Sequence, residues 1–188
     1  MERKVSILGF AGSLRKGSYN RAILRVAQES MPPGAQMEIF DLEGIPPFNQ
    51  DLENSPAKIV KEFKAKIRAA DGILIATPEY NYSIPGVLKN AIDSASRPYG
   101  DNAFDGKPVA VMGASIGNIG TARAQYHLRQ SFVFLNMIPM NMPEVMVGLA
   151  QEKIDENGRL HDQATREIIG KFVTSFAAWI QKVQKMKS

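Results

Sequence analysis

The chain has 188 residues, of which 44% are hydrophobic and 22% charged, and these values suit one domain over residues 1–188 with a buried core. The sequence contains no cysteine, which excludes disulfides, thiolate metal sites and cysteine nucleophiles and leaves redox chemistry to a bound cofactor. The net charge of +4 favours anionic ligands, and because most basic residues are scattered we expect no nucleic-acid partner.

The first part of the chain alternates short apolar segments with helical patterns. In chain order we expect a strand over 5–9, a helix over 18–30, a strand over 37–40 and a helix that begins at 56. Ser18 is the expected N-cap of the first helix, and Asn54 or Ser55 is the expected N-cap of the second.

The second part continues the alternation. A continuously apolar strand is expected over 72–76, followed by a helix over 86–96, a strand over 109–112, a helix ending near 134, a weaker strand over 145–147 and a helix over 165–182. Five strands alternating with five helices predict an α/β fold with a doubly wound parallel sheet. Ligands of such sheets lie beyond the carboxyl ends of the strands, so the loops after the first, third and fourth strands should hold the site.

The loop after the first strand, residues 12–20, has the composition of a phosphate-binding loop. Gly12 and Gly17 permit tight backbone geometry, and the following helix start offers unpaired N–H groups and a positive dipole end. The side chains available to a phosphate are Ser13, Arg15, Ser18 and Asn20. The alternative is an ordinary polar turn before a capped helix.

Two better-known phosphate loops do not fit this segment. A Walker loop requires lysine where Ser18 stands, and the order Gly9, Gly12, Gly17 does not match a dinucleotide fingerprint. A single terminal phosphate, as in FMN, suits the short serine-rich loop better.

The loop after the third strand, residues 77–86, reads TPEYNYSIPG. Its prolines stiffen the segment, and a stiff loop can direct successive backbone N–H groups toward one target. We expect that target to be the polar edge of a flavin ring, with Tyr80 or Tyr82 against the ring plane. The alternative is a rigid surface turn whose tyrosines fill a subunit contact.

Taken together, three segments resemble the NADPH-dependent FMN reductase family, and most closely its bacterial quinone and chromate reductases. They are GSLRKGSYNR (12–21), TPEYNYSIPGVLKNAID (77–93) and ARAQYHLRQ (122–130), within a resemblance that runs from Val5 to Trp179. The resemblance implies a flavodoxin-like sheet of strand order 2-1-3-4-5, non-covalently bound FMN, and a homodimer or homotetramer.

The same resemblance implies which residues bind FMN. The phosphate would be held by Ser13, Arg15, Ser18 and Asn20, and Tyr19 beside them would also bind the cofactor. The isoalloxazine ring would be lined by Pro78, Glu79, Tyr80, Asn81, Tyr82 and Ser83, and the ribityl or pyrimidine side by Ser115 and Gly117. Part of the subunit contact would come from Arg123, Tyr126, Arg129 and Glu144.

The implied activity is transfer of electrons from NADPH or NADH through FMN to quinones, flavins, azo compounds or chromate, by a ping-pong mechanism. We expect no catalytic residue in the strict sense, and we expect His127 and His161 to be structural or exposed. Arg97 and Tyr99 are candidate substrate residues that roof the flavin, the alternative being a plain connecting loop. The acidic residues lack metal-ligand spacing, so no metal site is expected.

Two other functions remain open from the sequence. One is a flavodoxin-like electron carrier without NAD(P)H activity of its own, which the basic charge argues against. The other is a nucleotide- or nucleic-acid-binding module without redox activity. No apolar run reaches the roughly 18 residues of a membrane span and no secretory signal is evident, so we expect a cytoplasmic protein with no membrane partner.

Overall fold

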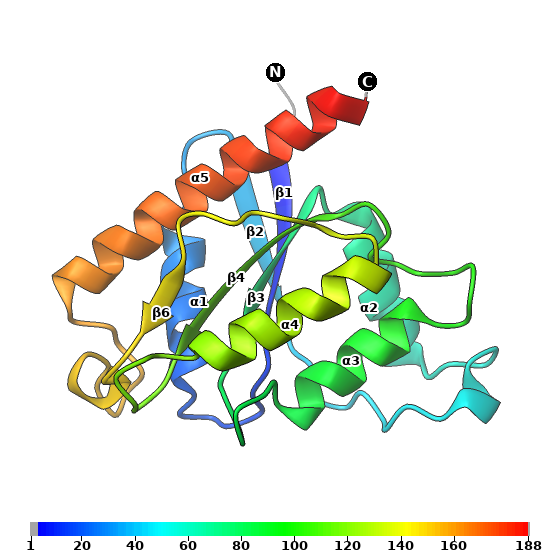
Figure 1. Cartoon of the computed structure of the whole chain (residues 1–188), viewed down its shortest axis with the longest axis horizontal. Coiled ribbons are helices and arrows are strands. Elements are labelled where there is room, and N and C mark those ends of the chain that lie inside the picture. The colour runs from blue at the N-terminus through cyan, green and yellow to red at the C-terminus, as the bar shows by residue number, and fades with distance from the viewer. Residues whose placement is uncertain (1–3, 188) are drawn as a thin grey trace.

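The computed structural model describes residues 4–187, and these form a parallel sheet flanked by helices (Figure 1). The strands are β1 (Val5–Ala11), β2 (Ala35–Phe40), β3 (Gly72–Ala76), β4 (Pro108–Ala114), β5 (Ile138–Pro139) and β6 (Val145–Val147). Their order is β2-β1-β3-β4-β5, with β6 also paired to β4. The doubly wound fold and the strand order 2-1-3-4-5 are therefore confirmed.

The fifth strand position differs from the expectation of one strand over 145–147. Two short strands share it: β5 pairs with the start of β4, where Ile138 lies opposite Pro108, and β6 pairs with its end, where Val145 lies opposite Met112. Between them the chain passes through Pro143, which has no N–H to donate to a ladder. The first piece is two residues long and includes Pro139, so it has no strand-like sequence pattern.

Helices cover both faces of the sheet. They are α1 (Tyr19–Glu29), α2 (Lys58–Ala69), α3 (Gly86–Ser96), α4 (Ala122–Phe134) and α5 (Gln163–Lys187), with short 3-10 helices η1 (Gln50–Leu52) and η2 (Ala150–Glu152) in the loops. One buried cluster joins α1 and α5 to the sheet and includes Leu24 and Phe172. A second cluster joins α2, α3 and α4 to the opposite face and includes Phe63 and Phe132.

The helix starts test the capping predictions. Ser18 is the N-cap of α1, and its hydroxyl accepts the Arg21 N–H at 3.3 Å, as expected. The prediction that Asn54 or Ser55 caps the second helix is wrong, because α2 begins after Ala57, which makes no side-chain cap hydrogen bond. The Ser55 N–H instead bonds to the Leu52 carbonyl at 2.9 Å, so this segment closes a turn after η1.

The loops that leave β1, β3 and β4 are fastened to one another at the carboxyl edge of the sheet. The Gly12 N–H donates to the Ala76 carbonyl and the Thr77 N–H to the Met112 carbonyl, each at 2.9 Å. Gly113 allows this close approach, since a Cβ there would lie 2.5 Å from the Thr77 carbonyl oxygen and collide with Thr121. None of the helices within residues 4–187 has the length and apolar character needed to cross a bilayer.

Candidate functional site

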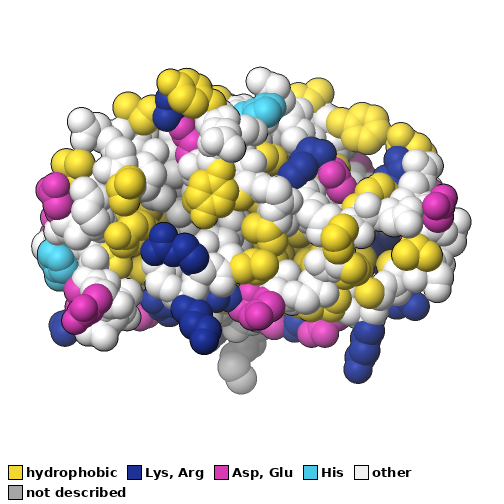
Figure 2. Space-filling model, turned by 90° about the horizontal axis from the view of Figure 1, so that it is seen from below, with side chains coloured by type: hydrophobic (Ala, Val, Ile, Leu, Met, Phe, Trp, Pro, Cys, Tyr) yellow, Lys and Arg dark blue, Asp and Glu magenta, His cyan; other side chains and the backbone are white. Residues whose placement is uncertain are grey.

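A cavity of about 300 Å³ lies where the three loops meet. Its lining consists of Ser13, Arg15, Ser18, Tyr19, Asn20, Pro78, Glu79, Tyr80, Ala114, Ser115 and Ile116. Figure 2 looks at this edge of the sheet and shows hydrophobic side chains spread over it among charged ones. The structure thus gathers most of the sequence-predicted site residues around one opening, although they come from segments up to about a hundred residues apart.

One end of the cavity is the N-terminus of α1, which suits an anion. The backbone N–H groups of Tyr19 and Asn20 meet no acceptor among the described residues, and they lie at the positive end of the helix. The Arg15 guanidinium donates to the Gly17 carbonyl at 3.0 Å and lies 5.9 Å from the Tyr19 ring centroid. A positive side chain and unpaired N–H groups therefore face the same space.

Asn20 has a structural role in addition to the predicted one. Its amide nitrogen donates to the Ala114 carbonyl and its amide oxygen accepts the Ala114 N–H, each at 2.9 Å. This pair of bonds ties the first turn of α1 to the end of β4. One amide hydrogen of Asn20 remains for a ligand.

The loop after β3 forms a tight hairpin. The N–H of Tyr80 bonds to the carbonyl of Ser83 and the N–H of Ser83 bonds to the carbonyl of Tyr80, each at 3.0 Å. The two residues between them, Asn81 and Tyr82, have φ values of 51° and 66°, as both central residues of a type I′ turn do. Since positive φ is unfavourable for tyrosine, the surrounding contacts must hold this conformation.

Those contacts come from α4. The Glu79 side chain is 6% exposed, and its carboxylate accepts the Ala124 N–H at 3.1 Å and pairs with Arg123. Glu79 thereby caps α4 in place of Thr121, whose side chain makes no cap bond. Sequence reasoning assigned Glu79 only to the flavin ring and missed this cap, because no local pattern connects residues 45 positions apart.

Two further contacts fasten the hairpin tip to α4. The Arg123 guanidinium carbon lies 3.6 Å from the Tyr82 ring centroid. The Ser83 hydroxyl forms a 2.7 Å hydrogen bond with Nδ1 of His127, which is exposed and has the structural contact expected of it. The hairpin and α4 therefore form one rigid unit beside the cavity.

Several predicted residues do not line the cavity themselves. Asn81, Tyr82 and Ser83 lie in the hairpin beyond its edge, and Gly117 lies farther along the loop after β4. Ala114 and Ile116 line the cavity and were missed, although their position on either side of Ser115 was a usable signal. The Ser115 hydroxyl donates to the Gly120 carbonyl, which closes that loop.

Arg97 and Tyr99 do not roof this cavity within the chain, contrary to expectation. They follow the far end of α3, where Arg97 pairs with Glu53 at 2.9 Å and its guanidinium carbon lies 3.7 Å from the Tyr99 ring centroid. The bond to Glu53 raises the pKa of Arg97 above its ordinary value. The buried ammonium of Lys64 holds this loop in place through the Arg97 carbonyl and the Asp101 carboxylate, whose pKa it lowers.

The described part of the chain contains no evident metal-binding site. Between residues 4 and 187, no three His, Cys, Asp or Glu side chains lie close enough together to hold a metal ion.

Comparison with known proteins gives consistent matches over nearly the whole chain. The family model of NADPH-dependent FMN reductases matches residues 5–152. An NAD(P)H-dependent FMN reductase of Pseudomonas aeruginosa is 51% identical, over 98% of this chain and 100% of the relative. A quinone reductase of Pseudomonas putida is 43% identical, over 96% of this chain and 97% of the relative.

A solved structure supports the same relationship. FerB, a flavoenzyme NAD(P)H:(acceptor) oxidoreductase from Paracoccus denitrificans, superposes with a TM-score of 0.86 at 37% identity. The superposition covers 94% of this chain and 97% of the FerB chain.

Proposed function

Since this chain belongs to the NADPH-dependent FMN reductase family, we propose that it is an FMN-dependent NAD(P)H oxidoreductase whose acceptors are quinones. The observation that carries the proposal is the single cavity formed by the phosphate-type loop after β1 and the hairpin after β3. We also propose that residues 1–188 form one domain.

The residues around the cavity fit FMN. Unpaired N–H groups of α1, the Ser18 hydroxyl and the Arg15 guanidinium would hold a dianionic phosphate. Pro78 and Tyr80 would line the flavin ring, and Ser115 would lie on its ribityl or pyrimidine side. Asn81, Tyr82, Ser83 and Gly117 would contribute from just outside the cavity. Glu79 would act by positioning the hairpin, since its carboxylate is already bonded to α4.

The protein's part in the reaction is to bind and orient. When bound, FMN supplies a ring that accepts a hydride and passes electrons on. The rigid hairpin would fix the ring edge, and backbone N–H groups there would stabilise negative charge on it. We propose no catalytic acid or base among the side chains of this chain.

Donor and acceptor would bind in turn at the same exposed side of the cavity, which gives ping-pong kinetics. We propose that flavins, azo compounds and chromate are accepted besides quinones, because electron transfer from an exposed ring requires little shape complementarity. NADPH and NADH are both candidate donors.

Steady-state kinetics test this proposal. The purified protein should be yellow and should oxidise NADPH or NADH in the presence of a quinone, with parallel double-reciprocal lines when both substrates are varied. A yellow protein with no NAD(P)H oxidation would be an electron carrier, and a colourless protein unable to take up FMN would be a binding module of another kind.

We further propose a cytoplasmic homodimer or homotetramer with α4 in its interface. Arg123, Tyr126 and Arg129 lie on this helix, and the Tyr126 hydroxyl is 3.4 Å from the Glu144 carboxylate. Val133 and Phe134, adjacent at its end, are 85% and 79% exposed, and a subunit contact would cover this apolar surface. A second copy would also supply the cover over the flavin that Arg97 and Tyr99 of the same chain do not form.

A further inference from the structure

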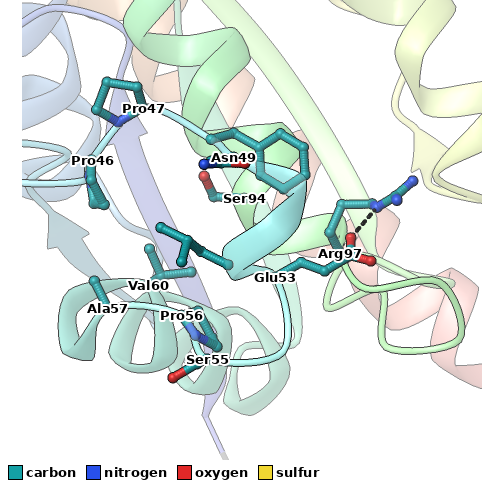
Figure 3. Close-up of a pocket in the computed structure, with 12 residues that line it drawn as sticks. Pro46, Pro47, Asn49, Glu53, Ser55, Pro56, Ala57, Val60, Ser94 and Arg97 are labelled. Atoms are coloured by element: carbon teal, nitrogen blue, oxygen red, sulfur yellow. Dashed lines mark hydrogen bonds and ion pairs between the residues drawn. The ribbon is translucent and has the colours of Figure 1, made fainter.

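A second cavity, of about 240 Å³, lies beside the start of α2 and the end of α3. It shares no lining residue with the cavity at the carboxyl edge of β1, β3 and β4. In Figure 3, Pro46 and Pro47 lie on one side of it, Pro56, Ala57 and Val60 on another, and Arg97 at the far end. The proposed flavin site does not account for this space.

The loop that walls this cavity is held in a fixed conformation. The Phe48 N–H donates to Oδ1 of Asn90 on α3 at 2.7 Å, and Nδ2 of the same Asn90 donates to the Pro46 carbonyl at 2.9 Å. Asn49 caps η1 by accepting the Asp51 N–H at 3.0 Å. The cavity is therefore preformed, which lowers the entropy lost when a ligand binds.

Apolar side chains that contact water line much of this space. Leu52 is 60% exposed and Phe48 is 36% exposed, although both line the cavity. Covering such surface is favourable by roughly 25 cal/mol per Å². The Phe48 ring also offers a flat face against which a planar ligand can pack.

Ser94 places one unused hydrogen-bonding group in the same cavity. Its residue is 8% exposed, it lines the cavity, and its hydroxyl has no hydrogen-bond partner within residues 4–187. Ser96, two positions along the same helix, differs because its hydroxyl donates to the Asp93 carbonyl at 3.1 Å. The Ser94 hydroxyl still contacts water, so a ligand in the cavity can exchange that contact for a direct hydrogen bond.

The charges at the rim cancel. Arg97 and Glu53 are 15% and 14% exposed and pair with each other at 2.9 Å, and they are the charged residues among those that line the cavity. A charged ligand would have to break this ion pair, or its own charge would remain without a partner in the cavity. The lining therefore favours an uncharged ligand.

We propose that this cavity is a binding site for an uncharged aromatic molecule of one or two rings that carries a hydroxyl or carbonyl group. The rings pack between the proline-rich loop and Val60, and the oxygen bonds to the Ser94 hydroxyl. The volume lies just below the usual range of about 300–1,000 Å³ for small-molecule sites, which limits the ligand to this size.

Binding of 2-naphthol to the FMN-saturated protein, measured by isothermal titration calorimetry, tests the proposal. We expect one saturable site per chain, about fivefold weaker in Ser94→Ala, the loss expected for one neutral hydrogen bond, and unchanged in Ser96→Ala. Leu52→Ala should also weaken binding, whereas Ile168→Ala, at a comparably exposed position on α5, should not.

Three results would overturn the proposal: no saturable binding, equal affinity for the parent and Ser94→Ala, or displacement of 2-naphthol by NADP⁺. The last would assign binding to the flavin cavity. If the protein fails to take up FMN, the same titration is run without FMN and with the same variants, so failure of the proposed function and failure of this site are distinguished.

Discussion

Among the described residues that line the first cavity, Arg15 is the one cation. The anion-binding role proposed for the α1 N-terminus therefore rests on one positively charged side chain together with backbone N–H groups. Arg15→Ala should weaken FMN binding by roughly 1.5–3 kcal/mol, the range for a charged hydrogen bond. Fluorescence titration of the apoprotein with FMN measures this change.

Arg159→Ala is the matched control, because Arg159 is exposed and lies outside the cavity. Its FMN dissociation constant should equal that of the parent. Equal FMN dissociation constants for the parent and Arg15→Ala would show that Arg15 does not bind FMN.

A substitution of Tyr82 tests separately what the hairpin contributes to stability and to enzymatic turnover. Its φ of 66° is strained for tyrosine, so Tyr82→Gly relieves strain while it removes the ring beside the cavity. We expect a melting temperature no more than about 4 °C below that of the parent, equivalent to roughly 1 kcal/mol, together with lower turnover of NADPH and quinone. Thermal unfolding and steady-state kinetics check the two parts.

Asn136→Gly is the control, since Asn136, just beyond the end of α4 and outside the cavity, has a φ of 53° and glycine there relieves similar strain with the Tyr82 ring retained. Its turnover should match the parent. A Tyr82→Gly variant that loses thermal stability but keeps full turnover would make the hairpin purely structural.

At the scale of helices and strands, local sequence patterns were sufficient to predict most of the fold. The bounds of β3 and α3 match those expected from a continuous apolar run and from the proline that directly precedes the helix. Ser18 was identified as a cap because serine directly precedes an amphipathic segment. These features depend on neighbours within one or two turns of chain, which is the range that a single sequence reveals.

Other features depend on distant contacts and escaped prediction. Glu79 caps a helix that begins more than 40 residues later, and Asn20 bonds to Ala114 across the sheet. The sequence-based expectation was that Arg97 lies over the flavin, whereas its ion pair with Glu53 holds it at the end of α3 away from the first cavity. In each case the tertiary fold, and not the sequence near the residue, determines which partner the side chain contacts.

Gly113 tests how the ends of the strands position the site. A Cβ at this residue would lie 2.5 Å from the Thr77 carbonyl oxygen, so the loop after β3 would have to move. Gly113→Ala should lower the free energy of unfolding by about 1–3 kcal/mol, as overpacking does, and should weaken FMN binding as well. Urea unfolding monitored by circular dichroism measures the first effect.

Gly170→Ala provides the comparison, because a Cβ at Gly170 on α5 meets nothing within 4 Å. Alanine there should raise the free energy of unfolding by roughly 0.5–1 kcal/mol through helix propensity. If Gly113→Ala were as stable as Gly170→Ala, the close approach of the loops would not constrain the site.

For the whole molecule, the exposed end of α4 predicts self-association. Val133→Asp with Phe134→Asp should shift the protein toward monomer, because charges replace apolar side chains in the proposed interface. Sedimentation velocity over a range of concentrations detects the shift. Ile168→Asp, on α5, should leave the assembly unchanged, and an unaltered assembly in the double variant would exclude this end of α4 from the interface.

The central claim is that the loops after β1, β3 and β4 bind one FMN in the cavity they enclose. Titration of the refolded, flavin-free protein with FMN, followed by quenching of flavin fluorescence, tests it most directly. The structure predicts saturation at one FMN per chain. A folded protein that leaves the fluorescence of added FMN unchanged at every ratio would contradict the claim.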